Sequence, residues 1–175
     1  MNLRLLNSTT TTAGVQFINI ENVFTTDFNV YHLVGSGLVG NTSTASGVNI
    51  RWLDQSGSVH SSNYDYGQSN MKAETSFNSS YSTSGDRVWN CFAGNDDGGQ
   101  SGNGNLWVFN PCVDDSYTYC TYHAAGMTSG NFRSYGGVSQ LHRTGKVTGF
   151  QVEVNDSSSS FAAGGKILTY GMRVD

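Results

Sequence analysis

Histidine and serine, the side chains of nucleophilic catalysis, are present in this chain but are not arranged for that chemistry. The four histidines, His32, His60, His123 and His142, fall in four separate segments. No serine lies in a G-x-S-x-G frame, and no H-E-x-x-H sequence occurs. We interpret the histidines that alternate within strand-like segments as structural. The sequence therefore predicts neither a serine hydrolase nor a zinc hydrolase.

Carboxylates likewise show no pairing suited to acid–base catalysis. The acidic pairs Asp96-Asp97 and Asp114-Asp115 both lie among glycine, asparagine and other turn-forming residues. The loop around the first pair has oxygen ligands of the type that calcium uses, but it lacks the spaced ligands and terminal glutamate of an EF-hand. A glycosidase needs two facing carboxylates, which the spacing of the glutamates does not indicate. We expect no enzyme activity, no metal and no cofactor.

Aromatic side chains are the remaining candidates for a binding site. Tyrosine and tryptophan in strands pack in cores and on sheet faces, and they also stack on sugar rings. Seven aromatic residues are candidates for such stacking: Tyr64, Tyr66, Tyr81, Trp107, Tyr117, Tyr119 and Tyr122. As a glycan-binding or partner-binding face we select Trp107, Tyr117, Tyr119 and Tyr122.

Composition narrows the class of protein. Charged residues make up only 13% of the chain, and the formal net charge is −4. The basic residues are scattered rather than grouped in a stripe, which argues against nucleic-acid binding. No apolar run approaches the roughly 20 residues of a membrane span. Low charge density also limits repulsion between neighbouring copies, as in proteins that pack in assemblies.

The cysteines are expected to be free thiols. Cys91, Cys112 and Cys120 make an odd number, and we find no secretory segment at the start of the chain. This does not indicate a disulfide framework, although a Cys112–Cys120 bridge is the one pairing that remains open. The absence of C-x-x-C and of histidines at ligand spacing argues against zinc.

Alternation of apolar and polar residues predicts β-strands along most of the chain. Residues 28–34 are expected to end at the Gly35-Ser36-Gly37 break, and residues 59–66 to return from a turn at 54–58. Residues 70–76 are a candidate for one helical turn, and residues 94–104 for a long glycine-rich loop. The other expected strands are residues 15–20, 48–53, 87–93, 105–110, 117–123, 138–142, 147–154 and 166–174.

Frequent strands without intervening helices indicate an all-β fold. We predict an antiparallel β-sandwich, jelly-roll-like, with about nine strands. Residues 15–175 form a single domain, and residues 1–14 form a flexible or partner-reaching N-terminal arm because their threonine-rich sequence is polar and of low complexity. The last strand, with Ile167, Leu168, Tyr170 and Met172, is expected to pair centrally or beside residues 28–34.

Four blocks of the chain resemble the small β-rich virion structural proteins of tailed bacteriophages, especially those of marine and cyanobacterial phages. The blocks are residues 17–34 (FINIENVFTTDFNVYHLV), 48–57 (VNIRWLDQSG), 104–111 (GNLWVFNP) and 164–172 (GGKILTYGM). They follow one another in order over nearly the whole chain. Thr169 departs from the larger apolar residue that is usual in this family. Cys112, directly after Asn110-Pro111, and the strand that contains Cys120 are also unusual.

The resemblance implies a non-enzymatic protein of the phage particle, made in the host cytoplasm and located in the virion. The favoured role is a capsid decoration or cement protein. The alternatives are a neck or tail-fibre component that contacts the host, or a carbohydrate-binding β-sandwich module. The expected partners are further copies of the chain, as a trimer by resemblance, the major capsid protein or other virion proteins, and a host surface glycan.

Overall fold

The computed structural model describes residues 3–41, 47–73, 76–94, 101–128, 131–155 and 157–173. This part of the chain contains twelve β-strands and no helix, rather than the expected nine strands. The strands are β1 (Leu3–Thr10), β2 (Phe17–Ile20), β3 (Val30–Leu38), β4 (Val48–Asp54), β5 (Tyr64–Lys72), β6 (Ser76–Gly85), β7 (Val88–Phe92), β8 (Gly102–Phe109), β9 (Thr118–Thr128), β10 (Asn131–Leu141), β11 (Val147–Val154) and β12 (Lys166–Met172).

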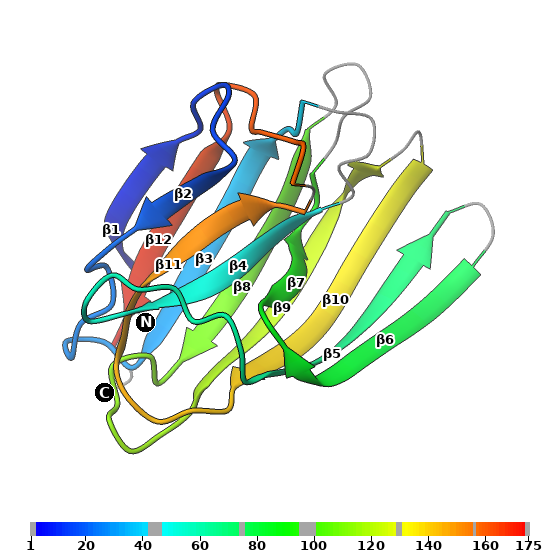
Figure 1. Cartoon of the computed structure of the whole chain (residues 1–175). Helices are drawn as coiled ribbons and strands as arrows, with labels where there is room; N and C mark the ends of the chain where they lie inside the picture. The colour runs from blue at the N-terminus through cyan, green and yellow to red at the C-terminus, as the bar shows by residue number, and fades with distance from the viewer. Residues whose placement is uncertain are drawn as a thin grey trace.

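The strands form two antiparallel sheets that face each other (Figure 1). The larger sheet has eight strands in the order β1-β12-β3-β8-β9-β10-β5-β6, and the smaller has four in the order β2-β11-β4-β7. The predicted all-β antiparallel sandwich is thus confirmed. The jelly-roll-like order of strands stays a prediction. In Figure 1, β5 and β6 extend beyond the smaller sheet, so one end of the larger sheet has no second layer.

The core between the sheets is built around large aromatic side chains. Phe24 packs with its ring centroid 4.6 Å from that of Tyr31 and 5.8 Å from that of Phe150. Tyr64 is fully buried, and its hydroxyl accepts a hydrogen bond from the Trp52 backbone N–H at 2.8 Å. Because Tyr64 belongs to the larger sheet and Trp52 to the smaller, this bond ties the two layers together while satisfying a buried polar group.

The expected break at Gly35-Ser36-Gly37 is wrong, because β3 continues to Leu38. A Cβ added to Gly35 would lie 2.6 Å from Cδ1 of Phe92, and one added to Gly104, the residue opposite on β8, would lie 2.9 Å from the same atom. The two glycines therefore form a bare patch of sheet on which the Phe92 ring rests. Here glycine marks close approach of a neighbouring side chain rather than a turn.

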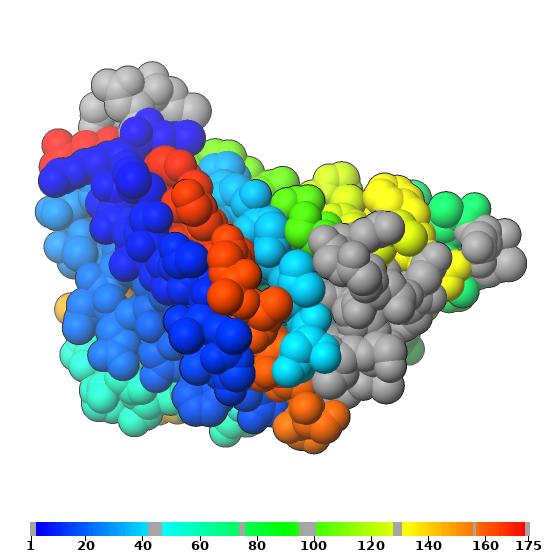
Figure 2. All heavy atoms as spheres, turned by 90° about the horizontal axis from the view of Figure 1, so that it is seen from above, coloured from blue at the N-terminus to red at the C-terminus, as the bar shows by residue number. Residues whose placement is uncertain are grey.

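The closing strand lies where it was expected. β12 pairs with β3, with Leu168 opposite Val34 and Tyr170 opposite His32. On its other side β12 pairs with β1, so both ends of the chain lie in one sheet. Figure 2 shows the dark-blue N-terminal segment beside the orange-red C-terminal one, followed by light-blue β3.

The expected start of ordered structure at Val15 is therefore wrong. Residues Leu3–Thr10 form the edge strand β1, and Thr11 extends the contact through its backbone N–H to the carbonyl of Gly165 at 2.7 Å. The threonine-rich sequence is polar, but threonine has high β-propensity, and pairing with β12 provides the ladder that such a segment needs. The sequence pattern alone did not show that a partner strand was within reach.

The segment after β4 also differs from expectation. The turn at residues 54–58 forms, with Asp54 Oδ1 accepting from the Ser56 and Ser58 backbone N–H groups at 2.8 and 3.0 Å. The expected return strand at 59–66 is reduced to an isolated bridge between Leu53 and Val59. Asn63, with a φ of 66°, precedes β5, which belongs to the other sheet.

The expected helical turn at residues 70–76 is also wrong for the residues that are described. Asn70 to Lys72 belong to β5, and Ser76 begins β6, while Glu74 and Thr75 lie outside the described residues. The two strands pair in register from Tyr66 to Lys72. Their weak apolar pattern is explained by their position, because little of this hairpin is buried against the smaller sheet.

Candidate functional site

One face of the eight-stranded sheet is turned away from the smaller sheet, and we call it the outer face. The side chains of the core, such as Leu33 and Leu106, define the opposite, inner face. Residues that alternate with them lie on the outer face. One row of directly paired residues crosses this face from edge to edge: Leu5, Tyr170, His32, Trp107, Thr121, Val138, Gly67 and Tyr81.

The outer face carries most of the exposed apolar side chains. Ten large hydrophobic side chains are exposed among the described residues, and two of these, Phe17 and Val113, lie elsewhere. By strand register the other eight lie on the outer face: Leu3, Leu5, Met71, Phe77, Tyr81, Tyr119, Phe132 and Val138. Apolar side chains gathered on one face, rather than scattered singly, are typical of an interaction surface.

His32 and Trp107 form a stacked pair near the centre of the outer face. Their ring centroids are 4.1 Å apart and the planes differ by 10°, with Tyr170 on the far side of His32 at 6.3 Å. Burial lowers the pKa of His32, because the half-covered imidazole is harder to charge. A hollow of about 780 Å³ lies beside the pair and is also lined by Asn103, Asn105 and His123.

A second hollow, of about 420 Å³, lies over Gly67 on the same face. Its lining includes Tyr81, Tyr119 and Val138, and a Cβ added to Gly67 would meet no atom within 4 Å. The missing side chain of Gly67 therefore leaves open space in the middle of a strand. We call this feature the Gly67 hollow.

A carboxylate held by two neighbours lies at the rim of the Gly67 hollow. Asp65 Oδ2 accepts a hydrogen bond from Gln140 Nε2 at 2.6 Å and lies 3.4 Å from His142 Nδ1. The His142 ring packs in turn against Tyr117, with centroids 4.7 Å apart. This arrangement orients the carboxylate before any ligand arrives, as preorganised binding sites do.

The four aromatic residues selected from the sequence do not share one face. Trp107 and Tyr119 lie on the outer face, and Tyr117, just before β9, has its ring centroid 6.4 Å from that of Tyr119. Tyr122 points into the interior, where its hydroxyl donates to Gln68 Oε1 at 3.1 Å and burial raises its pKa. The selection of Tyr122 is therefore corrected. The alternation of side chains from Tyr117 to His123 could have excluded it, because it places Tyr122 on the opposite face from Tyr119.

Other residues of the outer face were missed from the sequence. His32, Val138 and Tyr170 lie in strands that were predicted, but their neighbours across the sheet depend on strand order. Tyr81 was in the pool of aromatic candidates, yet its strand was not expected. Gly67 had no signal as a binding residue, because a glycine within a strand equally marks a bulge or a close backbone approach.

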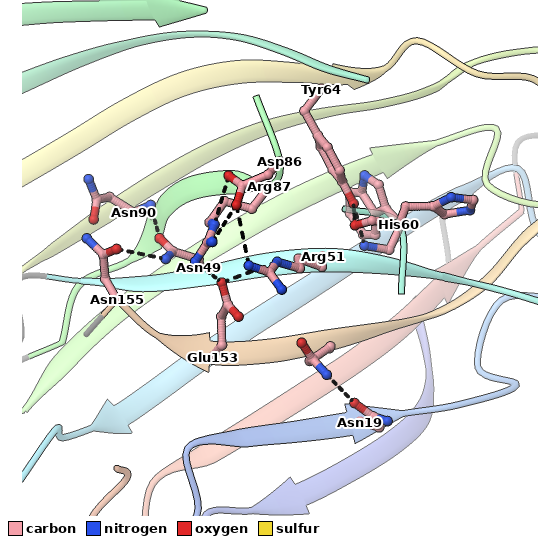
Figure 3. A network of polar contacts seen from close by, with 12 residues as sticks. Asn19, Asn49, Arg51, His60, Tyr64, Asp86, Arg87, Asn90, Glu153 and Asn155 are labelled. Carbon is pink, nitrogen blue, oxygen red and sulfur yellow. Dashed lines mark hydrogen bonds and ion pairs between the residues drawn. The ribbon is translucent and has the colours of Figure 1, made fainter. Parts of the chain in front are cut away.

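The exposed side of the smaller sheet is polar instead (Figure 3). Glu153 of β11 forms ion pairs with Arg87 and, at 3.5 Å, with Arg51, and Arg51 lies 3.4 Å from Asp86. The hydrogen bond from Arg87 lowers the pKa of Asp86. The two carboxylates pair with arginines rather than with each other, so the network stabilises this layer and offers no acid–base pair.

The remaining candidates from the sequence carry no site among the described residues. Cys91, Cys112 and Cys120 are free, and burial raises the pKa of Cys120 to about 12, as expected for an unreactive thiol. Lys146 Nζ lies 3.0 Å from Asp114 Oδ2 in a turn. The Asp96-Asp97 pair and residues 95–100 of the expected loop lie outside the described residues, whereas residues 102–104 belong to β8 rather than to a loop. Elsewhere in the described part, no three His, Cys, Asp or Glu residues come together as metal ligands do.

Comparison of the chain with protein-family models, with curated proteins and with solved structures finds no significant match. Within the described ranges, no helix has the length and apolar character that crossing a membrane requires.

Proposed function

We propose that this protein is a non-enzymatic structural protein of a bacteriophage particle that decorates or cements the capsid shell. The observation that supports the proposal most strongly is the gathering of eight exposed large hydrophobic side chains on the outer face. The resemblance of the four sequence blocks to phage virion proteins supplies the identity of the partner, a subunit of the shell.

The composition of the outer face suits docking onto a protein surface. Protein interfaces are enriched in aromatic side chains and methionine and are depleted of charge at their centres. Side chains of these types are exposed toward the end of the larger sheet that has no second layer, namely Phe77, Tyr81, Phe132 and Met71. Many copies bridging neighbouring shell subunits would gain stability from simultaneous contacts, each of which is weak.

The test is binding to particles that lack the protein, followed by reconstruction of the reloaded particles. Phe132 on the outer face and Phe17 on the smaller sheet are 53% and 55% exposed, so they make a matched pair. Phe132→Asp should lower occupancy about tenfold or more, since burying an unpaired charge costs more than 1.4 kcal/mol. Phe17→Asp should bind like the wild type.

Density for the protein on the capsid shell, contacting it through the outer face, is the expected result. Density only on the neck or tail fibres would replace the decoration role with the host-contacting alternative. Equal binding by the two aspartate variants would show that the outer face is not the docking surface.

A further inference from the structure

We propose that the Gly67 hollow binds the pyranose ring of a glycan. The walls of the hollow include Tyr81 and Tyr119, which are 84% and 40% exposed, so aromatic surface is available at both. Tyr81 lies opposite Gly67 on β6, and Val138 lies opposite Gly67 on β10. The glycine thus forms a floor between larger side chains, at a position where a side chain would fill the space.

The polar groups at the rim suit sugar hydroxyls. Asp65 Oδ2 is engaged by Gln140 and faces His142, while the described residues offer no donor to Oδ1. An ionised carboxylate only accepts hydrogen bonds, so Oδ1 is an oriented acceptor for a ligand hydroxyl. Thr83 and Thr121 also line the hollow, whose surface is otherwise mostly apolar.

The combination of these groups favours a sugar over an organic cation. The C–H face of a pyranose is apolar and stacks on aromatic rings, while its hydroxyls need several hydrogen-bonding partners at the edge. A quaternary ammonium ion would also be attracted to tyrosine rings and to a carboxylate. However, Asp65 is the only carboxylate among the residues that line the hollow, and its free Oδ1 can accept a hydrogen bond from a sugar hydroxyl, which a quaternary ammonium ion cannot donate.

The hollow shares Tyr81, Tyr119 and Val138 with the outer face that is proposed to dock on the capsid, so the two proposals are tested separately. The attachment test uses Phe132, which does not line the hollow, and the sugar test uses isolated protein. Either proposal can therefore fail without the other.

The experiment is saturation-transfer NMR and calorimetric titration with methyl pyranosides of glucose, galactose, mannose and N-acetylglucosamine. At least one pyranoside should bind saturably to the wild type. Gly67→Val places its Cβ in open space within the hollow and should lower affinity about tenfold or more. Asp65→Asn should have an effect of similar size, because it weakens a charge-assisted hydrogen bond.

Ser79→Val is the control, because Ser79 lies on the same face of β6 outside the hollow, and its affinity should equal that of the wild type. If Gly67→Val does not fold, Tyr81→Ala tests the aromatic wall of the hollow instead. This variant should fold, because the exposed Tyr81 ring contributes little to the core. No binding of any pyranoside by the wild type, or undiminished binding by the hollow variants, would overturn the proposal. Binding of tetramethylammonium in place of the sugars would also overturn it.

Discussion

At the level of single residues, Thr169 has a buried hydroxyl for which the described part of the chain offers no partner. The side chain is fully buried in β12, and its Oγ1 has no hydrogen-bond partner within the described structure. Thr169→Val replaces the hydroxyl with a methyl group of similar size. We expect it to raise the free energy of unfolding by about 1 kcal/mol, because the desolvation cost of an unsatisfied polar group disappears. Denaturant unfolding measures this change.

Thr11 provides the matched control for that prediction. It is also buried, but its Oγ1 donates to the Ala162 carbonyl at 2.7 Å and accepts from the Gly165 N–H at 2.9 Å. Thr11→Val should therefore destabilise the protein by about 1–3 kcal/mol. A Thr169→Val variant that is destabilised as much as Thr11→Val would show that the Thr169 hydroxyl has a partner after all.

The lowered pKa of His32 predicts a pH dependence of stability. Because burial lowers the pKa in the folded state, the unfolded chain takes up a proton more readily as the pH falls below the ordinary value of about 6.5. The pKa of His60 is also lowered, chiefly by burial and then by the charge of Arg143, so His60 contributes a pH dependence of the same sign. Stability should therefore be lower at pH 5.5 than at pH 7.5, and His32→Gln should reduce that difference.

NMR titration of the His32 ring protons checks the cause directly. Asp54 and Asp86 have lowered pKa values, through hydrogen bonds from Ser56 and Arg87 respectively. The stability that they contribute is lost only as the pH falls below about 3.8, outside this window. A His32 pKa at or above 6.5 would contradict the prediction.

At the level of elements, β12 is the strand that connects β1 to the rest of its sheet. Deletion of residues 166–175 removes the partner of β1 and exposes the edge of β3, together with the apolar surface that Ile167 covers. We expect aggregation or failure to assemble. Size-exclusion chromatography and thermal melting provide the measurement.

Deletion of residues 1–10 is the comparison, because it removes an edge strand and leaves β12 paired with β3. It should be tolerated better. A variant without residues 166–175 that stays soluble and melts near the temperature of the intact protein would show that β12 is peripheral.

The four edge strands differ in how well they are protected against pairing. β2 and β7 are short, with four and five residues, and β1 carries Arg4 and a register shift between Leu5 and Asn7. β6 has ten residues and carries no charge and no proline. Long uncharged edges template pairing with another strand. β6 is therefore the edge through which we expect copies of the chain to associate.

A lysine in the middle of β6 tests this expectation. Ser80→Lys should weaken self-association roughly tenfold, and Ser61→Lys, in an exposed loop, is the charge-matched control. Analytical ultracentrifugation of both variants and the wild type measures the association constant and also tests the trimer expected from the resemblance. Equal effects of the two lysines, or a wild type that stays monomeric, would exclude pairing through β6.

At the level of the whole molecule, the eight-stranded sheet is wider than the four-stranded one. Local stability should therefore be lower in the strands that the smaller sheet does not cover. β3 and β8 lie under the smaller sheet and contribute to the core, whereas nearly every residue of β6 is exposed. Segments with few buried apolar contacts open at low free-energy cost. Amide hydrogen exchange should therefore be fast along β6 and slow along β8. Equal protection of the two strands would contradict this view of the molecule.

The sequence by itself determined the properties that depend on alternation along one strand. It predicted the all-β class, the β4, β7 and β11 strands, the turn at Asp54 and the pairing of the closing strand with residues 28–34. These predictions succeeded because side-chain direction in a strand repeats every two residues, whatever the rest of the chain does.

Beyond the pairing of β12 with β3, only the tertiary structure decided which strands are neighbours and which face is left uncovered. Tyr81 and Tyr119 line one hollow although they are 38 positions apart in the sequence, because only β10 and β5 lie between β9 and β6 in the sheet. Gly35 continues a strand because Phe92 rests on it, and residues 3–10 form a strand because β12 offers them an edge. Pairing and burial are set by partners far away in the chain, so local pattern cannot specify them.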